Sequence, residues 1–217
     1  MNQSPRRYLI LHKPYNVLTQ FSDAEGRPTL ADYIAIPGVY AAGRLDQDSE
    51  GLLLLTDDGE MLHRVTHPHW KLPKTYLAQV EGVPAEADLA QLRAGVLVKG
   101  ERTAAAEVSL LPHPPDLPPR AVRAYHPTPW LRITLREGRK RQVRRMTAAV
   151  GFPCLRLVRV AIGPLSLGDL LPGQWRDLSA GERQALFQAV GLTEDAGPPV
   201  AARPRPSGRQ GKRPPRR

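Results

Sequence analysis

The stretch GRLDQDSEGLLLLTDDG, residues 43 to 59, sets five acidic side chains around four consecutive leucines. Turn-forming residues from Asp48 to Gly51 lead into Leu52 to Leu55, a pattern that predicts a tight turn followed by a short buried strand. The acids then lie at the mouth of that strand, where one of them, Asp46, can face a cleft.

Two other interpretations of these acids stay open at this point. In the first interpretation, all five acidic side chains are only solvent-exposed groups of two turns. The spacing of Asp46, Asp48 and Glu50 before Gly51 also imitates the start of an EF-hand calcium loop. The imitation ends at position 12 of the loop, where Asp57 stands in place of a bidentate Glu, so calcium binding is disfavoured.

Length and composition indicate a folded, globular protein. The chain has 217 residues, and 41% of them are hydrophobic, which is enough to cover a core. It has no run of 18 apolar residues and no apolar N-terminal leader, so we expect a cytoplasmic protein without membrane spans. Cys154 stands alone, and His63, His67 and His69 have no obvious fourth ligand, so neither a disulfide nor a metal site is expected.

The net charge of +10 is unevenly spread. Residues 200–217 carry seven cations and no acid, which leaves 24 cations against 21 acids in the rest of the chain. A segment rich in Pro, Gly and Arg buries too little apolar surface to fold alone, so a disordered tail that attracts phosphate is expected. The alternative is a tail that only keeps the protein soluble.

The order of the predicted elements favours an α+β fold with a mixed sheet. Strands and helices do not alternate strictly, which argues against a doubly wound parallel sheet, and the proline-rich residues 112–120 must form a loop. Strands are predicted at residues 8–11, 39–42, 52–56, 74–82 and 130–135, and helices at 30–34, 59–65 and 84–95.

A second informative segment is REGRKRQVRRMTAAVG, residues 136 to 151, with six cations and one acid in its first ten residues. On a helix, Val143 and Met146 share one side, whereas Arg141, Arg144 and Arg145 share the other. The apolar side should pack on the core. The basic side should face anions, either RNA phosphate or a protein carboxylate, unless it is only solvated.

Three segments, in this order and at this spacing, resemble the motifs of RNA pseudouridine synthases of the RsuA type. They are GRLDQDSEGLLLLTDDG at 43–59, KTY at 74–76 and EGRKRQVRRM at 137–146. HKPYNVLTQF at 12–21 and FPCLRLVRVAIGPLSLGDLLPGQWRDL at 152–178 also look like this family. The segments FSDAEGRPTLADYI and GVYAAGRLD resemble most the RluE group, which modifies a uridine in 23S ribosomal RNA.

The resemblance implies a pseudouridine synthase catalytic fold, an α+β fold with a mixed, largely antiparallel sheet flanked by helices. Most relatives carry an S4-type RNA-binding domain before the HKP segment, and with seven residues before Tyr8 we expect none here. The implied division is an N-terminal extension at 1–7, a catalytic domain at 8–192 with two sub-halves around a central cleft, and a disordered basic tail at 193–217.

The implied activity is isomerisation of a specific uridine in 23S ribosomal RNA, at an unpaired or loop position, by a monomer without a cofactor. By resemblance Asp46 is the catalytic carboxylate, either as a nucleophile at C1′ or as a group that stabilises and deprotonates the sugar. Tyr76 stacks on the detached base and accepts a proton, and Arg144 pairs with Asp46.

The resemblance also implies a set of RNA-binding residues. Arg44 fills the gap that the flipped uridine leaves in its stack. The other acids of the opening stretch, Asp48, Glu50, Asp57 and Asp58, are then turn residues. The remaining residues expected to contact RNA are Lys74, Arg139, Lys140, Arg141 and Arg145.

Two alternatives to this function remain. The protein can modify another uridine of ribosomal RNA, since Asp57 and Lys140 stand where relatives often have Asn, and Lys140 lies on the expected RNA face. Alternatively, it can be a non-catalytic assembly factor that binds ribosomal RNA. A pure binder gains nothing from a carboxylate in a cleft that faces phosphate.

Overall fold

The structure, a computed structural model, describes residues 5–70 and 72–193. Its strands are β1 (Tyr8–Lys13), β2 (Tyr40–Ala41), β3 (Glu50–Thr56), β4 (Lys74–Val80), β5 (Leu97–Val98), β6 (Glu101–Arg102), β7 (Glu107–Leu110), β8 (Trp130–Leu135), β9 (Cys154–Ile162), β10 (Leu165–Ser166) and β11 (Trp175–Asp177). Its helices are η1 (Leu30–Asp32), α1 (Gly59–Thr66), η2 (Pro68–Trp70), α2 (Glu86–Ala94), α3 (Gln142–Ala149) and α4 (Ala180–Ala189).

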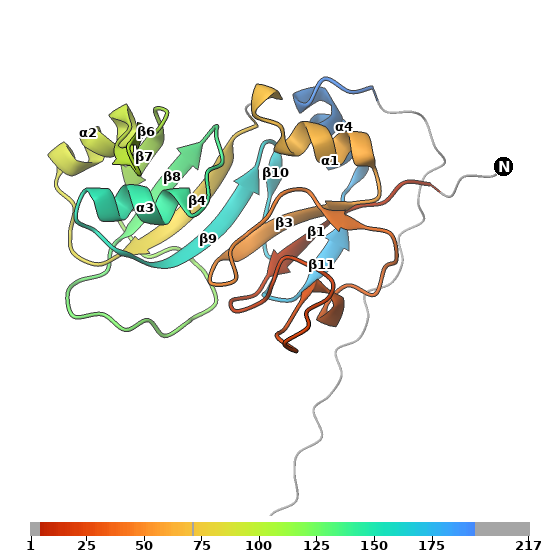
Figure 1. Cartoon of the computed structure of the whole chain (residues 1–217), viewed down its shortest axis with the longest axis horizontal. Helices are drawn as coiled ribbons and strands as arrows, with labels where there is room; N and C mark the ends of the chain where they lie inside the picture. The colour runs from red at the N-terminus through yellow and green to blue at the C-terminus, as the bar shows by residue number, and fades with distance from the viewer. Residues whose placement is uncertain (1–4, 71, 194–217) are drawn as a thin grey trace, which may run out of the picture.

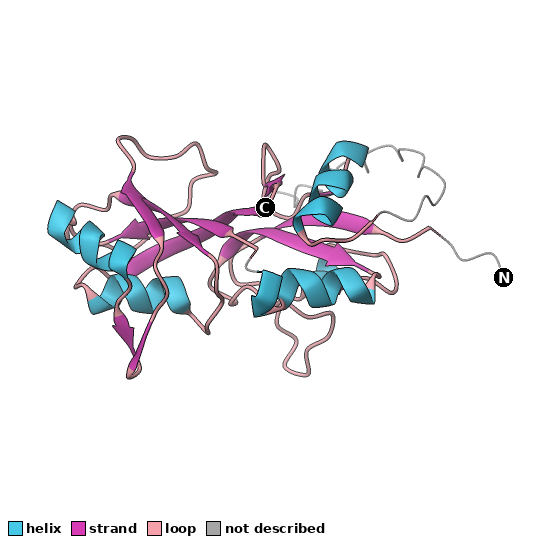
Figure 2. Ribbon diagram, turned by 90° about the horizontal axis from the view of Figure 1, so that it is seen from above, coloured by secondary structure: helices cyan, strands magenta, loops and turns pink. Residues whose placement is uncertain are grey.

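Within the described residues, nine strands form one sheet in the order β11-β1-β3-β9-β4-β8-β7, with β2 beside β3 and β10 beside β9. The pairings are antiparallel except that of β3 with β9. The sheet is one twisted layer along the whole molecule, with helices packed against it (Figure 2). The expected α+β fold with a mixed, largely antiparallel sheet is therefore confirmed.

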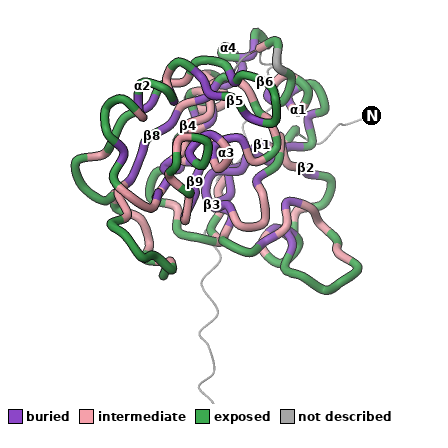
Figure 3. Tube along the Cα trace, turned by 60° about the vertical axis from the view of Figure 1, so that its left-hand side comes forward, coloured by how far each residue is buried: buried purple, intermediate pink, exposed green. Residues whose placement is uncertain are grey.

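The two ends of the sheet have separate hydrophobic cores (Figure 1). One core joins α1 and α4 to β1, β3 and β9, and a smaller cluster covers the other face of β1 and β3 with residues from 30–39. The second core joins α2 and α3 to β4, β7, β8 and β9. Buried backbone is concentrated along these central strands, whereas the peripheral loops are exposed (Figure 3). The strand β9 contributes to both cores.

The leucine stretch is a strand, as its composition predicts. All seven residues of β3 are buried, because the strand lies in the middle of the sheet with apolar clusters on both faces. The acids on either side of the leucines therefore lie at its two ends.

The basic segment 136–151 is only partly helical. Helix α3 begins at Gln142, because Arg141 adopts a left-handed conformation with φ 55° and cannot belong to the first turn. Residues 136–141 form a turn instead. Val143 and Met146 are buried as expected, and Gly151, with φ 93°, ends the helix.

Among the residues that the structure describes, no helix is both long enough and apolar enough to cross a membrane. The predicted basic tail lies outside the described residues from position 194 onward, as do residues 1–4.

Candidate active site

A cavity of about 550 Å³ lies between the two halves of the sheet. The loop that precedes β3 forms one wall with residues 43–47 and Ser49, and the turn between β8 and α3 forms the opposite wall with residues 135–143. Lys74 and Tyr76 of β4 and Leu157 and Arg159 of β9 also line the cavity. The volume is typical of a small-molecule site and suits one nucleotide, not a duplex.

Local hydrogen bonds hold the Asp46 loop in place. The Ser49 amide donates to the Asp46 carbonyl at 3.0 Å, which closes the turn into β3. From the HKP segment, the Thr19 hydroxyl donates to the Leu45 carbonyl at 2.7 Å and the Asn16 amide donates to the Gln47 carbonyl at 2.9 Å. The catalytic candidate is thus positioned from both sides by backbone contacts.

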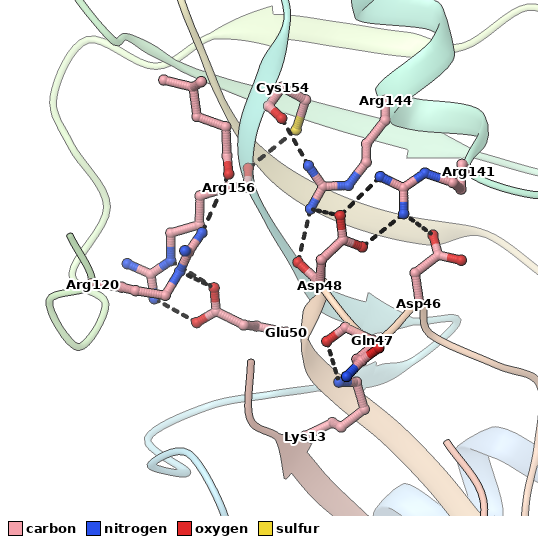
Figure 4. A network of polar contacts seen from close by, with 11 residues as sticks. Lys13, Asp46, Gln47, Asp48, Glu50, Arg120, Arg141, Arg144, Cys154 and Arg156 are labelled. Atoms are coloured by element: carbon pink, nitrogen blue, oxygen red, sulfur yellow. Dashed lines mark hydrogen bonds and ion pairs between the residues drawn. The ribbon is translucent and has the colours of Figure 1, made fainter. Parts of the chain in front are cut away.

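Lys13 also holds this loop in place, and its side chain is fully buried. Its Nζ donates to the carbonyls of Pro14 and Val17 at 2.8 and 2.7 Å. It also donates to the Gln47 carbonyl at 3.3 Å (Figure 4). Burial lowers the pKa of Lys13 to about 8, while the charges of Glu50, Asp48 and Asp46 oppose that shift. The sequence alone indicates no role for this lysine.

Asp48 lies in the turn, as expected, and its side chain also forms ion pairs with the opposite wall. Its two carboxylate oxygens accept bonds from Nη1 and Nη2 of Arg141, both at 2.8 Å (Figure 4). Arg144 adds a contact to the same carboxylate at 3.4 Å and donates to the Asp48 carbonyl at 2.8 Å. The Arg141 hydrogen bonds are the main reason that the pKa of Asp48 lies below its ordinary value.

Among the described residues, Arg144 contacts Asp48 and not Asp46, with which it was expected to pair. The Arg144 side chain, 11% exposed, donates to the carbonyls of Asp48 and Cys154, so its guanidinium joins the loop before β3 to β9. The cation nearest to the Asp46 carboxylate is Arg141, at 3.8 Å. Helix α3 explains the difference, since Arg141 precedes the helix and reaches along the cavity wall, whereas Arg144 points from the first turn toward β9.

Of Asp46 and Asp48, Asp46 has the carboxylate that is accessible from the cavity. Its side chain is 32% exposed and lines the cavity, and within the described residues it accepts no side-chain hydrogen bond. The Asp48 carboxylate does not line the cavity, and both of its oxygens are occupied. A reacting group needs unoccupied lone pairs facing the substrate, and Asp46 alone of the two meets that requirement.

Of the nine predicted site residues, seven line this cavity and two do not. Arg144 and Arg145 lie outside its lining. The seven residues that the fold brings together are Arg44, Asp46, Lys74, Tyr76, Arg139, Lys140 and Arg141.

The cationic residues of the cavity differ in how far their charges are already compensated. Arg44 and Lys140 are exposed and have no protein partner among the described residues. Arg139 is held by Glu101 and Glu137 at 3.1 and 3.4 Å, and Arg141 by Asp48. Lys74 donates to the Leu72 carbonyl, and burial, followed by the charge of Arg159, lowers its pKa.

Two further acids of the opening stretch are also structural. Glu50 is buried and bonds Arg156 at 3.0 and 2.8 Å and Arg120 at 2.8 Å (Figure 4). The Asp58 side chain caps the N-terminus of α1 by accepting the amide of Glu60 at 3.0 Å. A signal for the first case exists in the sequence, because two arginines interrupt the otherwise apolar run of β9.

Neither a reactive thiol nor a metal centre lies near Asp46 in the described part of the chain. Burial raises the pKa of the Cys154 thiol to about 11, so the reactive thiolate is not formed at neutral pH. Within residues 5–70 and 72–193, no group of three or more His, Cys, Asp or Glu side chains is placed to hold a metal ion.

Comparison with known proteins gives one consistent result. A sequence profile of the family described as RNA pseudouridylate synthase matches residues 7–149. A Vibrio parahaemolyticus protein named ribosomal large subunit pseudouridine synthase E is 54% identical over 176 residues, which cover 80% of this chain and 74% of that protein. A protein of the same name from Xanthomonas campestris pv. campestris is 56% identical, covering 77% of this chain and 93% of its own length.

A solved structure matches the fold as well. The structure titled crystal structure of pseudouridylate synthase superposes with a TM-score of 0.72 at 32% identity, over 84% of this chain and 74% of that chain.

Proposed function

Because this chain belongs to the RNA pseudouridylate synthase family, we propose that it converts a specific uridine of large-subunit ribosomal RNA to pseudouridine, with Asp46 as the catalytic carboxylate. The family match confirms the resemblance drawn from the three motifs, and the protein is accordingly an RNA-modifying isomerase. The large-subunit target rests on the names of the relatives. Such a target would place the protein in the cytoplasm.

The observation that carries the proposal is the Asp46 carboxylate, which accepts no side-chain hydrogen bond among the described residues and lines a cavity that also contains Tyr76 and several cations. Reaction requires cleavage of the C1′–N1 bond, rotation of the detached uracil and formation of a C1′–C5 bond. Asp46 acts on the ribose, either by attack on C1′ or by removal of a sugar proton. The Tyr76 ring supports the base, and its hydroxyl accepts a proton.

Arg141, not Arg144, is the arginine that orients Asp46 in this proposal. Its guanidinium is fixed by two bonds to Asp48 and remains 3.8 Å from the Asp46 carboxylate. Its positive charge favours the ionised form of Asp46 without occupying the carboxylate through a short hydrogen bond. Arg144 then acts by holding the Asp48 backbone.

RNA reaches the cavity through its exposed cations. A uridine in a duplex cannot enter, so the target is unpaired or flips out of its stack. Arg44, exposed at the cavity wall, fills the gap left by the flipped base, and Lys140 contacts the RNA backbone. Because an RNA-binding assembly factor would not need Asp46, the catalytic proposal is the one that uses all of these features.

The test is carbodiimide-dependent primer-extension mapping of ribosomal RNA from cells with and without the gene. We expect one stop in large-subunit RNA that disappears in the deletion strain and returns when the wild-type gene is restored. Disappearance of a stop from small-subunit RNA would relocate the target. Identical maps from both strains would contradict the proposal.

A further inference from the structure

Arg159, which lines the cavity, is a buried cation without a carboxylate partner among the described residues. The residue is 2% exposed, and Nε donates to the Leu52 carbonyl at 2.8 Å. Nη2 is buried without a hydrogen-bond partner, and the guanidinium has no ion pair with a carboxylate of the described residues. A guanidinium carries five N–H donors, so most of its hydrogen-bonding capacity is unused in the free protein.

The same strand shows what a purely structural arginine looks like. Arg156, three residues earlier in β9 and 4% exposed, places two bonds on the Glu50 carboxylate and is thereby neutralised. A buried charge without such a partner is costly, and an unpaired polar group of this kind calls for a functional explanation. Arg159 is therefore arranged for a ligand.

The sheet places Arg159 beside the position expected for the base. Tyr76 and Arg159 are direct partners in the β4–β9 register, so their side chains stand on the same face, and both line the cavity. Lys74, two residues before Tyr76, lines it as well. A ring stacked on Tyr76 would therefore share the cavity with these two cations.

Arg159 is close enough to Lys74 to disfavour the charged form of that lysine. After burial, the charge of Arg159 is the second reason that the pKa of Lys74 is lowered. An anion between them would remove this penalty. The RNA backbone must remain outside, since the strand enters and leaves the site, so the anion at this depth belongs to the base rather than to a phosphate.

We propose that Arg159, assisted by Lys74, stabilises the negative charge on the uracil after it is detached from the ribose. This inference rests on the proposed function, because it requires the target uridine to enter this cavity. Cleavage of C1′–N1 leaves the bonding electron pair on the base, which becomes a monoanion with charge on N1, O2 and O4. When C5 then bonds C1′, the C5 proton is lost and N1 gains a proton, so the base is neutral again and nothing is oxidised or reduced.

The test compares Arg159→Gln with wild type in single-turnover reactions at saturating RNA. Removing a donor at a site of developing charge typically lowers the rate about 10²- to 10³-fold, and we expect a loss of this size. Arg159→Lys keeps the charge without the planar fork and should lose only about tenfold. RNA affinity should stay within about threefold, because the interaction forms only after the bond breaks.

Two further readouts separate this role from others. Arg159→Gln removes a poorly compensated buried charge, so the thermal midpoint of this variant should be unchanged or higher. The matched control, Arg156→Gln, leaves the buried Glu50 carboxylate without its arginine partner in β9. This control should have a lower thermal midpoint but the wild-type rate. If Arg159 bound a phosphate instead, Arg159→Gln would weaken RNA binding and reduce the slope of log affinity against log salt by about 0.7.

The inference is overturned if Arg159→Gln reacts at the wild-type rate or if Arg159→Gln and Arg156→Gln lose the same rate. It is also overturned if Arg159→Gln reduces the slope of log affinity against log salt. Asp46→Asn, measured in parallel, distinguishes a failure of this inference from a failure of the proposed function. If Asp46→Asn is inactive while Arg159→Gln is normal, only the role of Arg159 fails. If Asp46→Asn also reacts at the wild-type rate, the reaction does not occur in this cavity at all.

Discussion

At the scale of single residues, the cavity separates two aspartates that the sequence alone cannot rank. Asp46 and Asp48 are two positions apart, yet the Asp46 carboxylate, 32% exposed, has only a 3.8 Å contact with Arg141, whereas the Asp48 carboxylate is bound by two arginines. The division follows from the turn at Asp46 to Ser49, which directs the two side chains differently. Their hydrogen bonds therefore leave Asp46 available to react and make Asp48 a residue that positions its neighbours.

The Asp48 pair predicts a specific dependence of stability on acid. Because the pKa of Asp48 is lower in the folded protein than its ordinary 3.8, its contribution to the free energy of unfolding is present above pH 4. As the pH falls below about 4, protonation removes that contribution. The difference in urea midpoint between wild type and Asp48→Asn should therefore shrink from pH 6 to pH 3. A constant difference would contradict the ion pair.

Tyr76→Phe tests the hydroxyl separately from the ring. Phe retains the stacking surface, so RNA affinity should be unchanged, while loss of a proton acceptor should lower the single-turnover rate about 10²-fold or more. A normal rate would restrict Tyr76 to stacking. Weaker RNA binding with a normal rate at saturation would contradict the position of the ring under the base.

At the scale of elements, the site depends on the pairing of β3 with β9. The two strands pair in parallel only at Glu50 with Val158 and at Gly51 with Arg159. Gly51 has φ 106°, and a Cβ added there would lie 2.2 Å from the Arg159 carbonyl oxygen. Glycine is required at this point, because the backbones of the two strands approach too closely for any side chain.

Gly51→Ala should therefore destabilise the protein by about 2 kcal/mol or more, since the positive φ and the overlap both oppose the methyl group. Equilibrium unfolding in urea measures the change. Gly59→Ala is the matched control, because Gly59 begins α1 with open space around it. This substitution should leave the stability of the protein unchanged or raise it by up to about 1 kcal/mol. Equal effects of the two substitutions would contradict the close approach of the strands.

Elements with a regular pattern can be predicted from the sequence, whereas their contacts cannot. The buried strand after Asp48, the helix before Gly95 and the loop at 112–120 all follow from local patterns. The start of α3 at Gln142 does not, because only the left-handed Arg141 excludes residues 136–141 from the helix. The roles of Asp48 and Arg159 are also hidden from the sequence, since their partners lie 93 or more residues away. The contact of Lys13 with the Asp46 loop is hidden for the same reason, since Gln47 is 34 residues away.

At the scale of the whole molecule, the cavity lies where two separately packed halves meet. The Asp46 loop belongs to the half with β1 and β3, and Tyr76 and the basic turn belong to the half with β4, β8 and α3. Asp48 with Arg141 and Arg144 connects the halves next to the cavity. The geometry of the site is therefore a property of the assembled sheet, not of either half.

The basic C-terminal segment remains a prediction from the sequence, since residues 194–217 lie outside the described residues. It carries seven cations between residues 200 and 217. Deleting 200–217 should weaken RNA binding and reduce the salt slope by about 0.7 for each phosphate that is no longer bound, while the single-turnover rate at saturating RNA and the modified position stay the same. An unchanged slope would indicate a solubilising tail, and a shifted position would transfer target selection to it.

The central claim is that Asp46 performs the chemistry, and single-turnover pseudouridine formation by Asp46→Asn tests it most directly. The amide has the size of the carboxylate but cannot act as a nucleophile or base, so we expect no pseudouridine, with RNA affinity within about threefold of wild type and an unchanged thermal midpoint. Pseudouridine formation by Asp46→Asn at the wild-type rate would contradict the account.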